Sequence, residues 1–422
     1  MKKRKLFDTL FAEKHKSKIS VVLGPRQVGK TMLLKQLYET LCATQNGLFL
    51  DLDILSNYEK VASYENLINT LLVSGYSLEQ KGTFYLFLDE FQRHAGFSKV
   101  LKNVYDHHKN IKIYATGSSS VKIKGEIQES LAGRKFIHYL YPLDFEEYLL
   151  FKEMEESRNQ LKNINKLTGQ NLPIAHFTKT LQEYMIFGGY PEVSLNDNPA
   201  DKQQVLSSVF DLYVKKDLVE YVNNKHLLNV KRLIEVLAVN HGQKIKYNEL
   251  AGICGLKEYE LKNYIEILKE TFLITELRPY YSNKNKEIVK IPKVYFMDPG
   301  VRNYFLNHFS PVEKRKDYGF LFEGFVMSQL LRAGYHKINY WQDKNKREVD
   351  FIVNKGHDLI PIEVKFKNTI KQNDFKGLAH FGRQYPKTRN FFLIAPQTQY
   401  AAQINEINIQ VLLPYHLKLP GF

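Results

Sequence analysis

Short apolar runs alternate with amphipathic stretches in the first third of the chain. Four runs have the length and composition of strands, and they cover 19–23, 48–52, 85–88 and 111–115. Apolar residues recur at helical spacing over 31–41, between the first two runs. Short buried strands separated by helices are typical of a parallel sheet. The pattern therefore predicts an α/β domain, which we place at residues 1–150.

A polar stretch and further helices follow. Residues 152–170 are rich in Lys, Glu, Asn and Gln, which indicates an insertion or linker. Helical spacing then resumes up to the breaker Gly188-Gly189-Tyr190-Pro191 and returns over 205–221. We therefore expect a helical linker or lid at 151–225.

Three helices and two strands are predicted for the domain at 226–297. The helices are expected near 230–239, 247–253 and 257–270, and the strands at 272–277 and 288–296 flank a polar tip at 282–287. This order is that of a winged helix-turn-helix. The third helix carries Lys257, Lys262 and Lys269 but also four glutamates. A DNA-reading helix usually presents a net basic face, so a structural or protein-docking role stays open beside DNA binding.

The residues from 298 to 422 predict a separate α/β domain. Helices are expected at 320–332 and 374–381, and strands at 338–341, 348–353, 360–365, 391–395 and 409–412.

Composition narrows the class of protein. The 422 residues are 44% apolar, which excludes a mainly disordered chain. The net charge of +15 fits a nucleic-acid partner or a solvated lysine-rich surface. Cys42 and Cys254 are too few and too far apart for a disulfide framework or a cysteine zinc site, and they fit a reducing cytoplasm. No apolar run approaches the roughly 20 residues of a membrane span, and Asp8 and Glu13 interrupt any secretory signal.

One motif points to phosphate binding. It reads Gly24, Pro25, Arg26, Gln27, Val28, Gly29, Lys30 and Thr31, followed by Met32. It matches G-x-x-x-x-G-K-[ST] and lies between a predicted strand and a predicted helix. The backbone amides would cradle the phosphates of a nucleotide. Lys30 would reach the β- and γ-phosphates, and the Thr31 hydroxyl would hold Mg²⁺.

Two carboxylates end a later apolar strand, in Leu86-Phe87-Leu88-Asp89-Glu90. Ligands of parallel sheets bind at this end of the strands. Asp89 would bind Mg²⁺, and Glu90 would orient and deprotonate the attacking water. The alternative is a solvated turn.

Other residues are weaker candidates. Thr116 and Ser118 follow the strand at 111–115, where a polar side chain could hold the attacking water or the γ-phosphate, and Ser118 is favoured. Arg134 could stabilise charge in the transition state or form a salt bridge at a helix end. Asp53 reads better as a turn residue. The chain shows no guanine-reading motif after the later strands, so the nucleotide is expected to be ATP.

A second group of charged residues lies in the last domain. Glu363 and Lys365 share one face of a strand because they are two residues apart, and Asp350 begins the preceding strand. Glu323 lies on the helix before them. Asp350, Glu363 and Glu323 are candidate Mg²⁺ ligands, and Lys365 would position water or stabilise charge beside a scissile phosphate. The spacing is similar to that of PD-(D/E)xK nucleases, although Val349 replaces the proline that often precedes the aspartate. Solvated edge strands would give the same pattern.

Taken in order, these motifs resemble a prokaryotic family that joins an AAA-type ATPase to a C-terminal restriction-endonuclease-like domain of unknown function. The match covers nearly the whole chain, and it extends to Leu-Ala-Gly-Arg (131–134), Phe-Gly-Gly-Tyr-Pro-Glu (187–192) and Asp-Pro-Gly-Val-Arg (298–302). The resemblance implies ATP binding and hydrolysis, a winged-helix middle domain, a nuclease-like fold and a prokaryotic cytoplasm. It does not define a substrate.

We therefore expect a cytoplasmic Mg²⁺-dependent ATPase whose nucleotide state is coupled to a nuclease-like domain that acts on or binds nucleic acid, DNA rather than RNA. The alternative is a nucleotide-gated switch for a protein or nucleic-acid partner, in which the nuclease-like domain is inert. No membrane partner is expected. A homo-oligomer fits the resemblance, because AAA-type sites often take an arginine from a neighbour, and Arg134 could act in cis or in trans.

Overall fold

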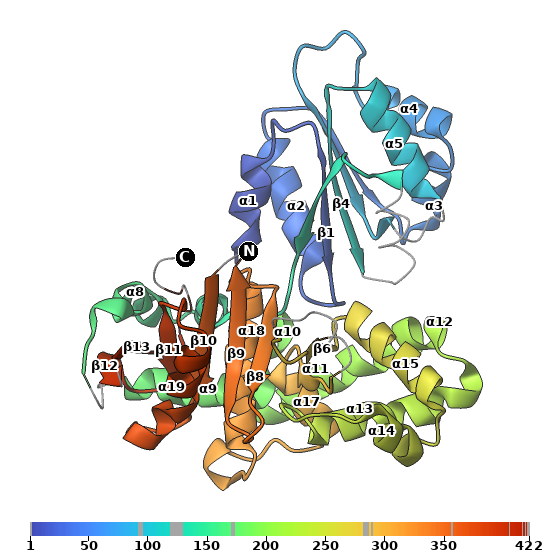
Figure 1. Cartoon of the computed structure of the whole chain (residues 1–422). Helices are drawn as coiled ribbons and strands as arrows, with labels where there is room; N and C mark the ends of the chain where they lie inside the picture. Colours follow the sequence, from blue (N-terminus) through green and yellow to red (C-terminus); the bar gives the residue numbers. More distant parts are fainter. Residues whose placement is uncertain are drawn as a thin grey trace. The chain divides into compact units, whose positions relative to one another are not determined.

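The computed structural model describes residues 2–91, 96–118, 130–169, 174–281, 287, 290–355, 358–404, 406–415, 417 and 419. The chain forms two compact units (Figure 1). The first contains Met1–Pro142 with Glu270–Phe272, and the second contains Leu143–Lys269 with Leu273–Phe422. Apart from residues 270–272, the regions predicted at 151–225, 226–297 and 298–422 thus fall in one compact unit. Within the described ranges, no helix is long and apolar enough to cross a membrane.

Five parallel strands form the sheet of the first unit. They are β1 (Ile19–Gly24), β2 (Gly47–Asp51), β3 (Phe84–Asp89), β4 (Ile111–Ser118) and β5 (Lys135–Tyr139). Their order is β2-β3-β4-β1-β5, and each neighbouring pair is parallel. The carboxyl ends of all five strands therefore meet at one edge of the sheet. The predicted strands are confirmed, but the sequence did not reveal β5, because this edge strand is only half-buried.

Helices cover both faces of this sheet (Figure 1). They are α1 (Leu6–Ala12), α2 (Lys30–Leu41), α3 (Leu55–Lys60), α4 (Tyr64–Val73) and α5 (Phe97–His107). One face packs on α4 and α5, with Leu71 and Leu101 fully buried against the strands. The other face packs on α1 and α2, where the Tyr114 hydroxyl donates to the Leu10 carbonyl at 3.0 Å. The central strands are buried on both faces, which explains their continuous apolar sequence.

The second unit begins with helices. They are α7 (Phe145–Phe151), α8 (Glu155–Asn163), α9 (Ala175–Phe187), α10 (Pro191–Leu195), α11 (Pro199–Leu212) and α12 (Val219–Tyr221). The polar segment at 152–170 is therefore largely helical rather than an open linker. Helix α9 ends at Gly188 as predicted. This residue has φ of +79°, and a side chain there would collide with Asp298.

Three helices and an antiparallel strand pair come next, as predicted. They are α13 (Leu227–Val239), α14 (Tyr247–Cys254), α15 (Glu258–Glu270), β6 (Ile274–Leu277) and β7 (Lys293–Phe296). Residues 282–286 of the predicted tip lie outside the described residues. Helix α17 (Pro299–Phe305) follows, and its N-cap is the buried Asp298.

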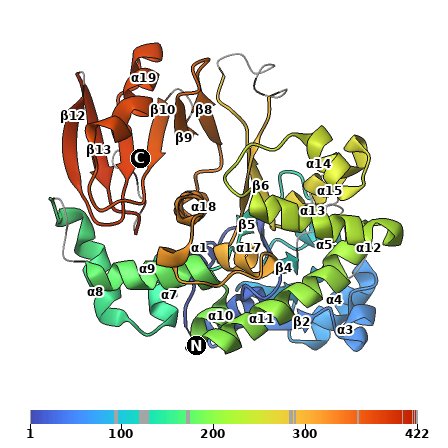
Figure 2. The same ribbon diagram turned by 90° about the horizontal axis from the view of Figure 1, so that it is seen from below.

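The C-terminal part builds a six-stranded mixed sheet (Figure 2). The elements are α18 (Tyr318–Arg332), β8 (Ile338–Gln342), β9 (Glu348–Lys355), β10 (Asp358–Val364), α19 (Lys376–Gln384), β11 (Phe391–Ile394), β12 (Tyr400–Ile404) and β13 (Ile407–Leu412). The sheet order is β12-β13-β11-β10-β9-β8. β8, β9 and β10 are antiparallel neighbours, and β10 and β11 are parallel. All elements except β12 match the prediction, and β12 escaped it because it is a partly exposed edge strand.

Candidate functional site

The loop after β1 has the backbone of an anion-binding nest. Gln27 and Gly29 have φ of +59° and +91°, and α2 begins directly after them at Lys30. Left-handed residues in a loop at a helix N-terminus turn amides toward a bound anion. β1 ends at Gly24, whose backbone lies so close to Leu140 that a Cβ would collide with the Leu140 carbonyl oxygen. Pro25, Arg26 and Val28 complete the loop, while Met32 is exposed in the first turn of α2.

Lys30 lies folded over this loop. Its Nζ donates to the carbonyl oxygens of Gly24 at 3.1 Å and Pro25 at 2.8 Å, and the residue is only 4% exposed. These contacts hold a positive charge beside the nest. A phosphate group in the nest would find both backbone donors and this ammonium group.

Residues from three elements meet at the carboxyl edge of the sheet. Asp89 is buried at the end of β3, and it accepts hydrogen bonds from the Thr116 and Thr31 hydroxyls. Burial raises the pKa of Asp89, and the two hydroxyl donors oppose this rise. A carboxylate with a hydroxyl oxygen beside it is a donor set that suits Mg²⁺, which prefers oxygen ligands. The predicted ligands Thr31 and Asp89 are thus side by side.

Thr116 and Ser118 lie at the carboxyl end of β4. Thr116 bonds Asp89 and also accepts the Glu90 amide at 3.4 Å. Ser118, the residue favoured from sequence, is buried opposite Gly24 in the β1–β4 register. Glu90 has φ of +52°, a conformation that costs energy for a residue with a side chain and often marks functional sites. Asp51, which the sequence analysis did not select, pairs in register with Asp89 and raises its pKa further.

Arg134 is far from this edge. Its guanidinium forms an ion pair with Asp106 at the end of α5, with Nε–Oδ1 at 2.8 Å and Nη2–Oδ2 at 3.1 Å. Its carbonyl accepts the amide of Ile19, at the amino end of β1. The P-loop follows the other end of β1, roughly 17 Å away at strand spacing. Of the alternatives that the sequence left open, the salt bridge at a helix end is the arrangement found, and in this chain Arg134 does not reach the nucleotide edge in cis.

Asp53 follows β2 as an exposed turn residue. Its amide donates to Asp51 Oδ1 at 3.0 Å, as in an Asx turn. The preferred interpretation from sequence agrees with this placement.

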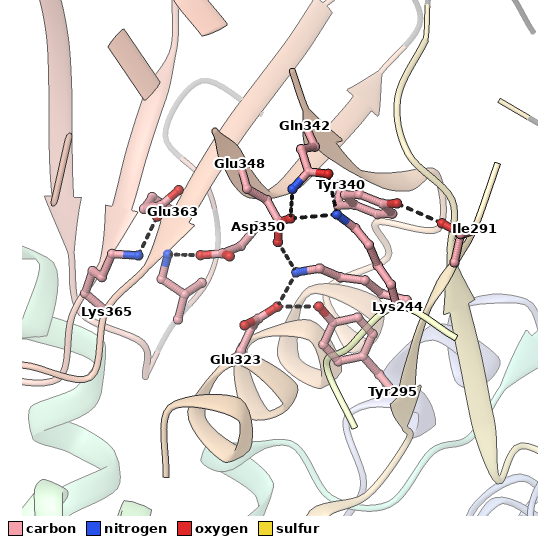
Figure 3. Close-up of polar contacts among 12 residues, drawn as sticks. Lys244, Ile291, Tyr295, Glu323, Tyr340, Gln342, Glu348, Asp350, Glu363 and Lys365 are labelled. Atoms are coloured by element: carbon pink, nitrogen blue, oxygen red, sulfur yellow. Dashed lines mark hydrogen bonds and ion pairs between the residues drawn. The ribbon is translucent and has the colours of Figure 1, made fainter. Parts of the chain in front are cut away.

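A second cluster of charged residues lies around β9 and β10 (Figure 3). Asp350 Oδ2 accepts the Val364 amide at 2.8 Å, and Glu363 Oε1 accepts a hydrogen bond from Lys365. Glu363 Oε2 is buried and has no hydrogen-bond partner among the described residues. Burial, and next the charge of Asp350, raise the pKa of Glu363 well above its usual value. The hairpin thus brings Asp350, Glu363 and Lys365 together as predicted.

Glu323 reaches the same region from α18 but is engaged elsewhere. It accepts hydrogen bonds from Lys293 Nζ at 3.2 Å and from the Tyr295 hydroxyl. Burial raises the pKa of Glu323 to about 7, and Lys293 opposes the rise. Across the described ranges, no three His, Cys, Asp or Glu side chains are placed to hold one metal ion. The three-carboxylate site expected from sequence is therefore not formed, and Glu323 is not a supported ligand. Asp350 and Glu363 still fit Mg²⁺, which commonly takes one or two carboxylates and completes its shell with water and phosphate.

Two lysines from the region before residue 298 offset the negative charge of this cluster. Lys293 Nζ on β7 lies 2.6 Å from Glu348 Oε1. Lys244 Nζ lies 3.1 Å from Glu348 Oε2 (Figure 3). Burial would raise the pKa of Glu348, but Lys293 and then Lys244 outweigh it, and the pKa is lowered. The sequence analysis missed both lysines. The only sequence signal for Lys293 was its position at the start of the predominantly apolar run Lys293-Val294-Tyr295-Phe296.

A Lys293→Met variant tests this balance. It leaves the buried Glu323 without its cation, whereas the partly exposed Glu348 keeps Lys244. Breaking a buried ion pair typically costs about 3–5 kcal/mol. We expect a loss of that size in the free energy of unfolding, measured by urea denaturation. Lys290→Met removes an exposed lysine three residues earlier and is the matched control. Adding Glu323→Gln to Lys293→Met should recover part of the loss. Equal stability of the Lys293 and Lys290 variants would contradict the ion-pair role.

The lysines of α15 are also neutralised locally. Lys262 pairs with Glu258 at 2.6 Å, and Lys269 pairs with Glu266 at 2.7 Å and with Glu276 at 3.1 Å. The described part of this helix therefore presents no uncompensated basic stripe for phosphates.

Comparison with known proteins places the chain in a family. Residues 16–149 match the AAA domain family, 178–311 match a domain of unknown function (DUF8612), and 318–415 match another (DUF4143). The chain is 31% identical over 376 residues to the uncharacterized protein MJ1544 of Methanocaldococcus jannaschii, covering 85% of this chain and 78% of that one. It belongs to the MJ1544 family.

Other similarities are weaker. An uncharacterized protein of Haemophilus influenzae is 26% identical over 378 residues, covering 87% of this chain and 88% of that one. The Thermotoga maritima RuvB Holliday junction branch migration motor aligns with a TM-score of 0.30 and 16% identity, over 64% of this chain and 89% of that one. The match to the AAA domain confirms that this member of the MJ1544 family has an AAA-type P-loop domain with a parallel α/β sheet.

Proposed function

We propose that this protein is a Mg²⁺-dependent ATPase whose nucleotide state is coupled to a nuclease-like domain that binds or cleaves nucleic acid. One observation carries the ATPase part: Lys30, Thr31 and Asp89 converge beside the nest at the carboxyl edge of the parallel sheet. The AAA domain match over 16–149 supports ATP as the nucleotide.

Each residue at this edge has a role in the proposed hydrolysis. The loop amides and Lys30 bind the β- and γ-phosphates and neutralise the charge that develops during transfer. Thr31 and Asp89 would hold Mg²⁺, which would supply neutralisation of the negative charge on the phosphates. Glu90 accepts a proton from the attacking water and orients it toward the γ-phosphate. Thr116 fixes Asp89 through its hydroxyl, and Ser118 is a second candidate for contact with that water or phosphate.

A Glu90→Gln variant separates ATP binding from hydrolysis. The amide keeps the size of the side chain but cannot accept the proton, so we expect kcat to fall by about a hundredfold. ATP affinity should stay near that of the parent, because Lys30 and the loop amides are unchanged. Phosphate release and calorimetric titration measure the two quantities. Glu79→Gln removes an exposed carboxylate from the same unit as a control, and an unchanged kcat in Glu90→Gln would exclude Glu90 as the base.

The nuclease-like part of the proposal rests on the C-terminal unit. The order α18-β8-β9-β10-α19-β11 brings Asp350, Glu363 and Lys365 together on one hairpin. Asp350 and Glu363 would hold Mg²⁺, and Lys365 would position the attacking water or stabilise charge on the scissile phosphate. DNA is the favoured substrate over RNA. A cytoplasmic location is part of the same proposal and is consistent with the two free cysteines.

We also propose that the three helices and strand pair at 227–296 form a winged helix with a mainly structural role. The third helix neutralises its own lysines, whereas β7 contributes Lys293 to the carboxylate cluster. This favours a supporting role over DNA reading by α15.

The alternative is a nucleotide-gated switch in which the nuclease-like domain is inert and holds a protein or nucleic-acid partner. The hydrogen bond that occupies Glu363 Oε1 and the engagement of Glu323 favour this second candidate. An Asp350→Asn variant distinguishes the two.

A further inference from the structure

Arg4 is buried behind the P-loop. It lies before α1, outside the residues that match the AAA domain, and it is only 5% exposed. Its Nη1 donates to the Val28 carbonyl at 2.7 Å, and its Nη2 donates to the Tyr141 carbonyl at 2.8 Å. Gln36 of α2 donates to the Lys2 carbonyl at 3.3 Å and fastens the same segment. A guanidinium thus joins two stretches of backbone that are far apart in sequence.

The contact with Val28 bears on phosphate binding. Val28 lies between the two left-handed residues Gln27 and Gly29. A loop that turns its amides toward an anion turns carbonyls away from it, and a buried carbonyl needs a donor. Arg4 supplies that donor with a permanent charge, which makes the hydrogen bond stronger than a neutral one. Its positive charge also favours an anion in the nest without touching it.

The contact with Tyr141 reaches the end of the first unit. Tyr141 precedes Pro142, the last residue of that unit before Leu143 begins the second. The Leu140 amide donates to the Leu23 carbonyl at 2.8 Å, and Leu140 lies against Gly24 so closely that a Cβ has no room there. The segment 140–142, defined here as the connector, is therefore bonded directly to the end of β1 and, through Arg4, to Val28 within the phosphate-binding loop.

We infer that Arg4 is a positioning residue of the nucleotide site, which holds the P-loop in its phosphate-binding conformation and links the state of the loop to the connector. The inference rests on the proposed ATP binding and assigns a residue and a route to the coupling. A nucleotide that orders the Val28 peptide also restrains Tyr141, because one rigid guanidinium donates to the carbonyls of both residues.

Arg4→Ala and Arg4→Lys variants test the inference in the full chain. Removal of a buried charged donor should weaken binding of AMP-PNP with Mg²⁺ by about tenfold to a hundredfold in calorimetric titration. The Arg4→Lys variant keeps the positive charge but lacks the planar group that donates to both carbonyls. Its affinity for AMP-PNP should therefore fall between those of the alanine variant and the parent. Lys3→Ala removes the neighbouring exposed lysine, which pairs with Asp8 at 2.5 Å, and should bind like the parent.

Hydrogen exchange at the connector supplies a readout that a merely structural role would not move. In the parent, saturating AMP-PNP should slow exchange of the Leu140 and Tyr141 amides. The Arg4 variants are measured at a higher AMP-PNP concentration, which saturates their weaker site. In both variants, exchange of the Leu140 and Tyr141 amides should then be the same with and without the nucleotide. Thermal unfolding without nucleotide checks the fold, and Arg4→Lys carries the test if the alanine variant is unfolded.

The outcomes are distinct. If the parent binds AMP-PNP and the Arg4 variants match Lys3→Ala in affinity and in connector exchange, the role of Arg4 is wrong while ATP binding stands. If the parent itself does not bind the nucleotide, the proposed function fails.

Discussion

A Lys30→Ala variant should lose at least about a thousandfold in kcat/KM for ATP. The ammonium group is held beside the nest by the Gly24 and Pro25 carbonyls, at the position where the β- and γ-phosphates would bind. Its removal takes away ground-state binding and the neutralisation of charge in the transition state together. Phosphate release at several ATP concentrations, with Mg²⁺ present, separates the losses in kcat and KM.

The matched control is Lys35→Ala. Lys35 is exposed on the same helix, so its removal changes the net charge equally without touching the loop. It should hydrolyse ATP at the rate of the parent. Binding and hydrolysis by Lys30→Ala at parental levels would mean that the nucleotide site is assigned to the wrong place.

Cleavage of nucleic acid, where the parent shows it, should fall by about a thousandfold in an Asp350→Asn variant. Loss of a metal ligand removes several kcal/mol of transition-state stabilisation, and each factor of ten corresponds to about 1.4 kcal/mol. Asparagine keeps an oxygen that can accept the Val364 amide, so the hairpin should be preserved. The assay uses supercoiled, linear and single-stranded DNA and RNA, with Mg²⁺ or Mn²⁺, with and without ATP.

Asp358→Asn is the control for this experiment, because Asp358 is an exposed carboxylate at the start of β10. It should cleave like the parent. Equal cleavage by Asp350→Asn and the parent would exclude the carboxylate cluster as the active site. If the parent cleaves none of the substrates while its ATPase activity is intact, the switch with an inert nuclease-like domain becomes the better account.

Local patterns in the sequence predicted most strands and the position of the phosphate-binding loop. Buried strands read as continuous apolar runs, and the spacing of the P-loop motif places Lys30 and Thr31 at a helix start without further information. The two edge strands β5 and β12 were missed because they are half-exposed and carry weaker patterns.

Contacts between distant segments were harder to predict. For Arg134, a role at the nucleotide stayed open beside a salt bridge because β5 was unrecognised. A residue that precedes a parallel strand lies at the opposite edge from the ligands. Lys293 and Lys244 belong to another predicted domain than the carboxylates they neutralise, so no spacing rule joins them. Glu323 was correctly placed near Asp350 but not with its partners Lys293 and Tyr295.

The ion pairs of β7 also bear on how modular this protein is. Residues 318–415 match a domain family of their own, yet they contain Glu323, Glu348, Asp350 and Glu363 with only Lys365 of the three lysines in the cluster. A fragment cut at residue 318 would keep the acids and lose Lys244 and Lys293. A protein that carries this C-terminal domain without the preceding one therefore needs a replacement cation, or neutral side chains, at the positions of Glu323 and Glu348. In this chain the region 178–311 supplies two of the cations that neutralise the carboxylates of 318–415.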